Sequence, residues 1–138
     1  MSEDFSTLSK KLETVCIEVP KVYDFCFQTD RRENICTPLG DFTPSDGASV
    51  QCKIISTSCS EVDRGEPDAS GRANVTFAVT VNYKLKVVSA TGQVERRFDD
   101  LSFSFTKTIV LCAPEGTFTN CEIVNTSCFC MILREQIC

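Results

Sequence analysis

The chain has 138 residues and contains neither histidine nor tryptophan. Without histidine it lacks the commonest general base, and the usual Ser–His–Asp and Cys–His catalytic arrangements are excluded. It has no run of about 18 apolar residues, the length that a membrane-spanning helix requires. No glycine-rich phosphate loop follows a predicted strand. We therefore expect a protein that is not an enzyme and that binds no cofactor.

Positive charge is also scarce. The sequence has 14 Lys and Arg against 19 Asp and Glu, a formal net charge of -5, and its basic residues are scattered. Binding to nucleic acid needs a concentrated cationic surface. We therefore expect no nucleic-acid partner, and the missing apolar run indicates no membrane partner.

Cysteine, by contrast, is abundant. A high and even count in a small domain is typical of disulfides formed in an oxidising place. The polar amino terminus has no apolar segment of a secretory signal, so we expect synthesis in the cytoplasm, where thiols stay reduced. Three explanations are open: metal binding, a signal that has been removed, or oxidation after the producing cell dies. The ten disulfide candidates are Cys16, Cys26, Cys36, Cys52, Cys59, Cys112, Cys121, Cys128, Cys130 and Cys138.

Residues 73–111 hold two long alternating runs joined by Ser89-Ala90-Thr91-Gly92. Successive side chains of a strand point to opposite faces, so each run predicts a strand with one apolar and one polar face. Gly92 supplies the positive φ that a short hairpin turn needs. We therefore predict a long antiparallel hairpin whose odd-numbered face packs into the core. The apolar residues of its first run are Val75, Phe77, Val79, Val81, Tyr83, Leu85 and Val87.

The second run changes its parity near Asp99-Asp100. Val94, Arg96 and Phe98 precede a series with the opposite parity, whose apolar residues are Leu101, Phe103, Phe105, Ile109 and Leu111. One extra residue would restore the inward face, so we predict a β-bulge there. Adjacent strand residues point to opposite faces, which indicates two solvated charges rather than an acid/base pair.

The remaining chain predicts shorter strands. We expect strands at residues 15–27 with a bend at Pro20, at 48–59, at 117–126 and at 128–134, with polar connections at 28–47 and 60–72. Residues 1–14 form an N-terminal arm that is either flexible or docked on a neighbouring subunit. Residues 15–138 then form one domain, an all-β antiparallel sandwich of jelly-roll type with seven to nine strands.

An internal repeat involves four of the cysteines. The stretch from Cys52 to Cys59 matches the stretch from Cys121 to Cys128 at five of eight positions. Cysteines seven residues apart on a strand lie roughly 23 Å apart, beyond the reach of a disulfide. Pairing between the two copies, or with other strands, is geometrically easier. Chance similarity of two strands is the other interpretation.

Two further patterns have plain structural interpretations. Cys128-Phe129-Cys130 places two sulfurs on one strand face, but a zinc site would want CxxC pairs, so we expect no metal. Asn74-Val75-Thr76 and Asn125-Thr126-Ser127 fit the glycosylation triplet. Without an export signal we interpret both asparagines as polar strand residues.

Two segments resemble a known family. VCIEVPKVYDFC (residues 15–26) and FTKTIVLCAPEGT (residues 105–117) are similar to the SPOCS-type domain associated with spore coats and to its small cysteine-rich relatives in spore-forming Firmicutes. The motifs within them are Lys21-Val22-Tyr23-Asp24 and Lys107-Thr108-Ile109-Val110-Leu111-Cys112, and the resemblance spans residues 15–134. It implies an assembly module without active-site residues. The peptidoglycan-binding LysM module of larger members is absent, which leaves anchoring of that kind in doubt.

The resemblance also implies how the cysteines become oxidised. A spore coat protein is made in the mother-cell cytoplasm without a signal, is deposited on the spore surface, and meets oxidants during assembly or after lysis. Disulfide-linked spore appendage subunits, small β-sandwiches with flexible N-terminal arms, are similar in architecture.

These observations give a functional hypothesis. We expect a self-assembling structural protein of the spore coat, exosporium or appendages, in which an arm or an edge strand docks on the next copy and disulfides stabilise the polymer. Other spore coat proteins are further expected partners. Cys16 and Cys138 are the candidates for intermolecular disulfides, and the cysteines inside the strands are expected to pair within the chain. The rival hypothesis is a monomeric, cysteine-rich module that binds a metal or a ligand.

Overall fold

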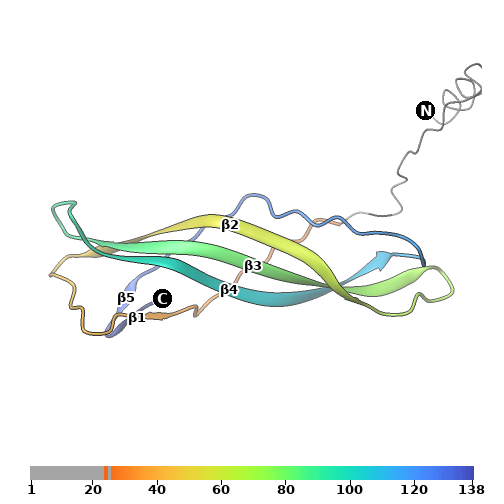
Figure 1. Cartoon of the computed structure of the whole chain (residues 1–138), viewed down its shortest axis with the longest axis horizontal. Coiled ribbons are helices and arrows are strands. Elements are labelled where there is room, and N and C mark those ends of the chain that lie inside the picture. Colours follow the sequence, from red (N-terminus) through yellow and green to blue (C-terminus); the bar gives the residue numbers. More distant parts are fainter. Residues whose placement is uncertain (1–23, 25) are drawn as a thin grey trace, which may run out of the picture.

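A computed structural model describes Asp24 and residues 26–138. These residues form two antiparallel sheets of three strands each, so the predicted all-β class is confirmed. The long sheet has the order β2-β3-β4, and the short sheet has the order β1-β6-β5 (Figure 1). The strands are β1 (Thr37–Pro38), β2 (Ser49–Arg64), β3 (Arg72–Val88), β4 (Val94–Cys112), β5 (Ile132–Leu133) and β6 (Gln136–Ile137).

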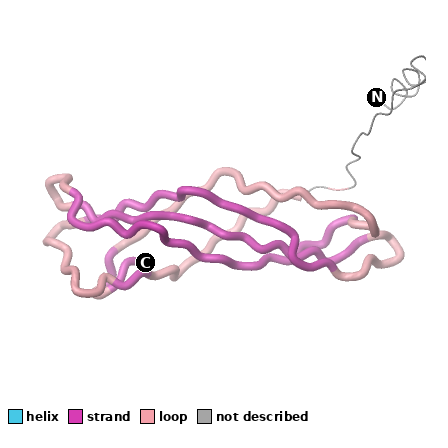
Figure 2. The backbone as a smooth tube through the Cα atoms, viewed as in Figure 1, coloured by secondary structure: helices cyan, strands magenta, loops and turns pink. Residues whose placement is uncertain are grey.

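The molecule is elongated along the long sheet. Figure 2 shows the three long strands running its whole length, with extended connections crossing the sheet. The short sheet lies beside the end that carries the β3–β4 turn (Figure 1). In the part of the chain that the structure describes, no helix is long and apolar enough to cross a membrane.

The predicted central hairpin is confirmed as β3 and β4, which pair from Arg72↔Cys112 to Val88↔Val94. Its turn is closed by the Gly92 N–H, which donates to the Ser89 carbonyl at 2.9 Å. Gly92 has φ +91, a conformation that residues with a Cβ rarely adopt. The glycine therefore permits the reversal that the alternating pattern on either side requires.

The predicted bulge at Asp99-Asp100 is also confirmed. Tyr83 pairs with Leu101 and Leu85 pairs with Phe98, so two residues of β4 lie opposite Lys84 alone. Asp100 adopts φ +57, and both aspartates are exposed. The extra residue returns Leu101 and the following apolar residues to the face that Phe98 occupies.

β2 is longer than predicted. The strand expected over residues 48–59 continues to Arg64, so the predicted loop at 60–72 is shortened to residues 65–71. Two register shifts in its pairing with β3 leave Ile55 and Val62 unpaired and exposed. Each extra residue keeps the half-buried side chains of β2 on one face. Such bulges interrupt the two-residue alternation of apolar and polar side chains in the sequence. The predicted strand therefore ended too early, at residue 59.

The odd-numbered face of β3 packs into the core at both ends, as predicted. One buried cluster comprises Leu39, Leu85, Val87 and Ile137, and the other comprises Ala73, Val75, Phe77 and Ala113. Between them, Val79 and Val81 are only half-buried. Single extended segments, rather than a full second sheet, cross the long sheet there (Figure 2). The core is therefore divided into two clusters along the long axis.

The opposite face of the long sheet is polar and nearly free of charge in its middle. Hydroxyl side chains lie in register across the strands, as in the row of Ser58, Thr80 and Ser104. Thr80 and Ser104 share a hydrogen bond of 2.9 Å, and Thr76 and Thr108 share one of 2.7 Å. Hydrogen bonds between hydroxyls of opposed residues stabilise neighbouring strands.

The short strands differ from the prediction. Residues 117–131 are extended but belong to neither sheet, so the strands predicted at 117–126 and 128–134 are wrong except for β5. β1 was expected to be part of a loop, and it forms only through its pairing with β6 at Thr37↔Ile137 and Pro38↔Gln136. The described residues form six strands, and the jelly-roll order stays a prediction.

The predictions for residues 1–14 and for most of residues 15–27 lie outside the described residues. The adjoining segment contacts β4 through two basic side chains. Lys107 lies 3.5 Å from the Asp30 carboxylate, and the Arg32 guanidinium lies 3.9 Å from the centroid of the Phe105 ring. The segment before β1 therefore crosses the inner face of the sheet at Phe105.

Candidate functional site

Among the residues that the structure describes, three disulfides join two stretches of the chain. Cys36 is bonded to Cys138, Cys52 to Cys128 and Cys59 to Cys121. Each bond has one cysteine in what we call the receiving stretch, residues 36–64, and the other in the C-terminal segment, residues 117–138. The pairs are nested, because the order of the first cysteines is reversed in the second. The C-terminal segment therefore runs antiparallel to β2 and is fastened along its whole length.

The internal repeat explains two of these bonds. The cysteines do not pair within either copy, as the spacing predicted, and of the two alternatives left open they pair between the copies. Residues seven positions apart on a regular strand point to opposite faces, so both copies need one extra residue for two parallel bonds. β2 provides it at Ile55, where its register with β3 shifts.

The second copy contains a matching irregularity. Asn125 lies between Cys121 and Cys128 and adopts φ +56, in the left-handed region that asparagine tolerates best after glycine. Asn125 was predicted to be a strand residue, and this prediction is wrong, because the residue lies in the extended C-terminal segment. The odd spacing of the cysteines is the sequence signal that could have predicted a kink in each copy.

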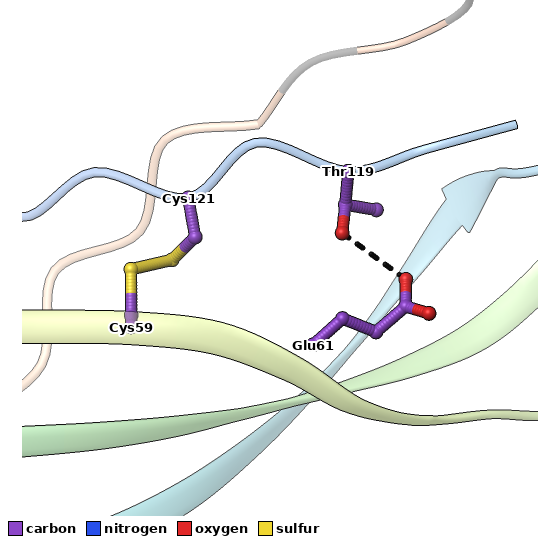
Figure 3. The surroundings of a disulfide bond; sticks show 4 residues. All are labelled: Cys59, Glu61, Thr119 and Cys121. Carbon is purple, nitrogen blue, oxygen red and sulfur yellow. Dashed lines mark hydrogen bonds between the residues drawn. A yellow bond between two sulfur atoms is a disulfide. The ribbon is translucent and has the colours of Figure 1, made fainter.

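Hydrogen bonds continue the contact beyond the disulfide. The Thr119 hydroxyl donates to Glu61 Oε1 at 3.1 Å, directly beside the Cys59–Cys121 bond (Figure 3). Arg64 Nη1 donates to the Thr117 hydroxyl at 2.9 Å. Cys59 thus contacts Cys121, and Glu61, two residues later, contacts Thr119, two residues earlier, as expected for two antiparallel segments.

Glu61 is the charged centre of this contact. Arg64 donates to Glu61 Oε1 through Nη2 at 2.6 Å and through Nε at 3.2 Å. These hydrogen bonds, with that of Thr119 and the positive charge of Arg64, hold the pKa of Glu61 below its ordinary value, although partial burial acts in the other direction. Glu61 therefore stays ionised and accepts hydrogen bonds from both Arg64 and the C-terminal segment.

The backbone of the C-terminal segment contributes little between its ends. Residues 118–130 make no backbone–backbone hydrogen bond to any other described residue. Open grooves flank the Cys59–Cys121 bond on both sides, between β2 and residues 117–124. Phe118 is 97% exposed and Phe129 is 81% exposed. Side chains and disulfides, and not a β-ladder, hold this part of the segment on β2.

The far end of the segment is anchored by packing. The Ile137 side chain is fully buried against Leu39, Leu85 and Val87. The Leu39 N–H donates to the Glu135 carbonyl at 2.8 Å, next to the ladder between β1 and β6. The last residues therefore close one of the two core clusters.

The intermolecular role of both candidate cysteines stays a prediction. Within the single chain, Cys138 is bonded to Cys36, because the β1–β6 register places these residues side by side. Cys16, the other intermolecular candidate, lies outside the described residues. Cys26, Cys112 and Cys130 are free thiols, and burial raises the pKa of the Cys130 thiol. The Cys130 thiol is therefore less readily ionised to the nucleophilic thiolate than an ordinary cysteine thiol.

No group of three or more Cys, Asp and Glu side chains that could hold a metal ion is found among residues 24 and 26–138. The two cysteines of the Cys128-Phe129-Cys130 motif, which were predicted to share one strand face, differ in their bonding. Cys128 is bonded to Cys52, whereas Cys130 packs against the cluster around Leu85. The chemistry that the described site offers is thiol–disulfide chemistry.

The chain is similar to exosporium protein A of Clostridium sporogenes (strain ATCC 15579), with 31% identity over 118 residues. The matched region covers 74% of this chain and 36% of that protein, so the chain spans about a third of the length of its curated relative. No family model matches the sequence. No solved structure matches it either. The SPOCS-type resemblance thus rests on its motifs alone, and the established similarity is to one part of an exosporium protein.

Proposed function

We propose that this chain is a self-assembling structural protein of the bacterial spore surface and that disulfides stabilise its polymer. The similarity to exosporium protein A carries the assignment to the spore surface. The three nested disulfides support a structural role, because they fasten a sheet with a divided core against unfolding. The finer choice among coat, exosporium and appendage belongs to the same proposal.

The long sheet offers a means of assembly. β4 has 19 residues and lies at one edge of the sheet, where β3 is its neighbour. An edge strand presents unpaired N–H and C=O groups to which another chain can add. Contacts that are not reciprocal propagate into filaments when they do not close into rings. A second copy is the principal partner in this proposal, with other coat proteins as secondary partners.

The change from a reducing to an oxidising environment during spore formation accounts for the many cysteines of this chain. In the proposal, the chain is synthesised in the mother-cell cytoplasm with reduced thiols and is oxidised during or after deposition on the spore. Oxidation then converts a reversible assembly into a covalent one. No catalytic step is assigned to any residue.

Gel electrophoresis of the oxidised protein tests the proposal. We expect a ladder or high-mass material without reductant that resists heat and detergent, and a single band at the mass of the chain after reduction. A single monomer band under both conditions would show that no covalent polymer forms.

Localisation requires a separate test. Immunogold labelling of thin-sectioned spores should place the protein in an outer layer, and a strain that lacks the protein serves as the control. Label confined to the spore core or to the mother-cell cytoplasm of mature sporangia would contradict the spore-surface assignment.

A further inference from the structure

The three disulfides share a property that independent cross-links would not have. Every one has one cysteine in the receiving stretch and the other in the C-terminal segment. None of the three involves β3 or β4. If the C-terminal segment of one copy occupied the receiving stretch of another, all three bonds would become intermolecular while each cysteine kept the same partner.

The contacts of the segment suit such an exchange. Its middle, residues 118–130, makes no backbone ladder with described residues, so its transfer breaks no β-sheet there. Two disulfides and the hydrogen bonds of the Glu61 and Arg64 side chains connect it to β2, and Cys121 and Cys130 pack against the core clusters. The open grooves beside Cys59 and Cys121 leave the bond between these two cysteines accessible.

The C-terminal segment also contains residues that would fix its position on another copy. Ile137 fills the core cluster of Leu39, Leu85 and Val87, and β6 pairs with β1. These contacts would place an arriving segment in the correct register before any bond forms. Fully buried apolar side chains are the usual anchors of such docking.

A hinge connects the segment to the long sheet. Ala113 is buried, and its N–H donates to the Gly71 carbonyl at 2.9 Å, so the chain is fixed up to this residue. A turn follows, in which the Thr117 N–H donates to the Pro114 carbonyl at 3.2 Å and Gly116 has φ +84. Opening this turn redirects the segment without disturbing β4. Exchange of an identical element about such a turn is a low-cost route to oligomers.

We propose that the C-terminal segment is exchanged between copies during assembly, so that Cys121, Cys128 and Cys138 of one copy are oxidised onto Cys59, Cys52 and Cys36 of the next. The exchange rests on the proposed self-assembly and names the partner site within it. Reciprocal exchange closes a dimer, whereas exchange passed from copy to copy gives an open chain.

The chemistry of each bond balances with a disulfide oxidant such as oxidised glutathione. The thiolate of one cysteine attacks a sulfur of the oxidant and releases one glutathione thiol. The second cysteine then attacks this mixed disulfide and releases the other. Each new S–S bond thus transfers two electrons and two protons to the oxidant, which becomes two thiols.

Isotope mixing of the unaltered protein tests the exchange. Reduced chains of natural and heavy-isotope composition are mixed in equal amounts and assembled. They are then oxidised with glutathione disulfide, digested and analysed by mass spectrometry. Complete exchange predicts that about half of the peptide pairs linked through Cys59–Cys121 combine one light and one heavy chain. The pairs linked through Cys52–Cys128 and Cys36–Cys138 should show the same fraction.

Two other outcomes separate the exchange from the proposed function. If a covalent polymer forms while every peptide pair linked through these three bonds is either entirely light or entirely heavy, the exchange is wrong and self-assembly stands. If no polymer forms and no mixed pair appears, both are wrong.

Complementary variants give a second test. One chain carries Cys36→Ser, Cys52→Ser and Cys59→Ser, and the other carries Cys121→Ser, Cys128→Ser and Cys138→Ser. Neither can form any of the three bonds alone. Mixed and oxidised, they should form the three bonds between unlike chains, identified by peptide mapping, and either variant oxidised alone is the control. Loss of all three linked peptides from the mixture, with both reduced chains shown by circular dichroism to retain β-structure, would overturn the exchange.

Discussion

Cys59 and Cys121 are bonded across the two copies of one local repeat, with their Cα atoms 5.7 Å apart. Their companions seven residues away, Cys52 and Cys128, are bonded in the reverse order. β2 has an unpaired extra residue at Ile55, and the C-terminal segment has a left-handed residue at Asn125, so both segments depart from the regular strand period between their two cysteines. The repeat is thus a matched pair of attachment points that fixes the C-terminal segment on β2.

Removing this attachment should destabilise the oxidised fold. The Cys59–Cys121 bond closes a sequence separation of 62 residues. Because the Cys52–Cys128 bond remains, we expect Cys59→Ser with Cys121→Ser to lower the free energy of unfolding by about 2–4 kcal/mol. Denaturant unfolding monitored by circular dichroism measures the loss. The control is Cys26→Ser, which removes an exposed free thiol and should leave the midpoint unchanged. Equal midpoints for all three proteins would mean that this bond does not constrain the fold.

The bulge in β4 should make the folding free energy more sensitive to substitution of Asp100 than of Asp99. Asp100 has φ +57 and Asp99 does not have a positive φ. A β-branched residue is strained in the left-handed region, so Asp100→Val is expected to cost about 1–2 kcal/mol of folding free energy. Asp99→Val removes the same charge and should cost less. Chemical denaturation of both variants checks this difference, and equal losses would argue against the bulge geometry.

Acid should weaken the contact between β2 and the C-terminal segment. The pKa of Glu61 is lowered in the folded state, so its stabilising contribution is fully present above the ordinary carboxyl value of 4.5 and is lost as the pH falls through the lower folded value. Glu61→Gln should remove this contribution, which is roughly 1 kcal/mol or less for a partly exposed pair.

The measurement is the difference in unfolding free energy between the wild type and Glu61→Gln as a function of pH. It should be largest at neutral pH and shrink under acid. Glu122→Gln, which changes an exposed carboxylate of the C-terminal segment, is the matched control. A wild-type advantage that grows as the pH falls would contradict the assignment.

The last strand should be held by one side chain. Ile137 is 0% exposed, whereas Leu133 on β5 is 45% exposed. Ile137→Ala should cost about 2–5 kcal/mol because it leaves a cavity in the cluster around Leu85, and Leu133→Ala should cost much less. Limited proteolysis under reducing conditions should release the C-terminal segment of Ile137→Ala first. Similar protease resistance in both variants would show that the anchor lies elsewhere.

The central hairpin could be predicted because its information is local. Alternation from Val75 to Val87, the turn at Gly92 and the change of parity at Asp99-Asp100 each follow from the period of a strand. β1, β5 and β6 could not be predicted in this way. Each has two residues and exists only through pairing with a strand far away in the sequence, so no periodicity marks it.

Only part of the candidate disulfide site could be predicted from the sequence. The spacing within the repeat excluded bonds inside either copy, but it left open whether the partners lay in the other copy or in other strands, and the structure pairs the two copies. The strand predicted at residues 117–126 is wrong, because there the side chains meet β2 while the backbone forms no ladder. The pairing of Cys138 with Cys36 could not be predicted, because it depends on the burial of the neighbouring Ile137 and not on a local pattern.

Negative-stain electron microscopy of the purified chain, before and after oxidation, tests the central claim of self-assembly most directly. The account predicts regular fibres or sheets in the oxidised sample that persist on dilution and on heating in detergent, and that disperse when reductant is added. Particles no larger than one elongated domain in both samples, at every concentration tried, would contradict it.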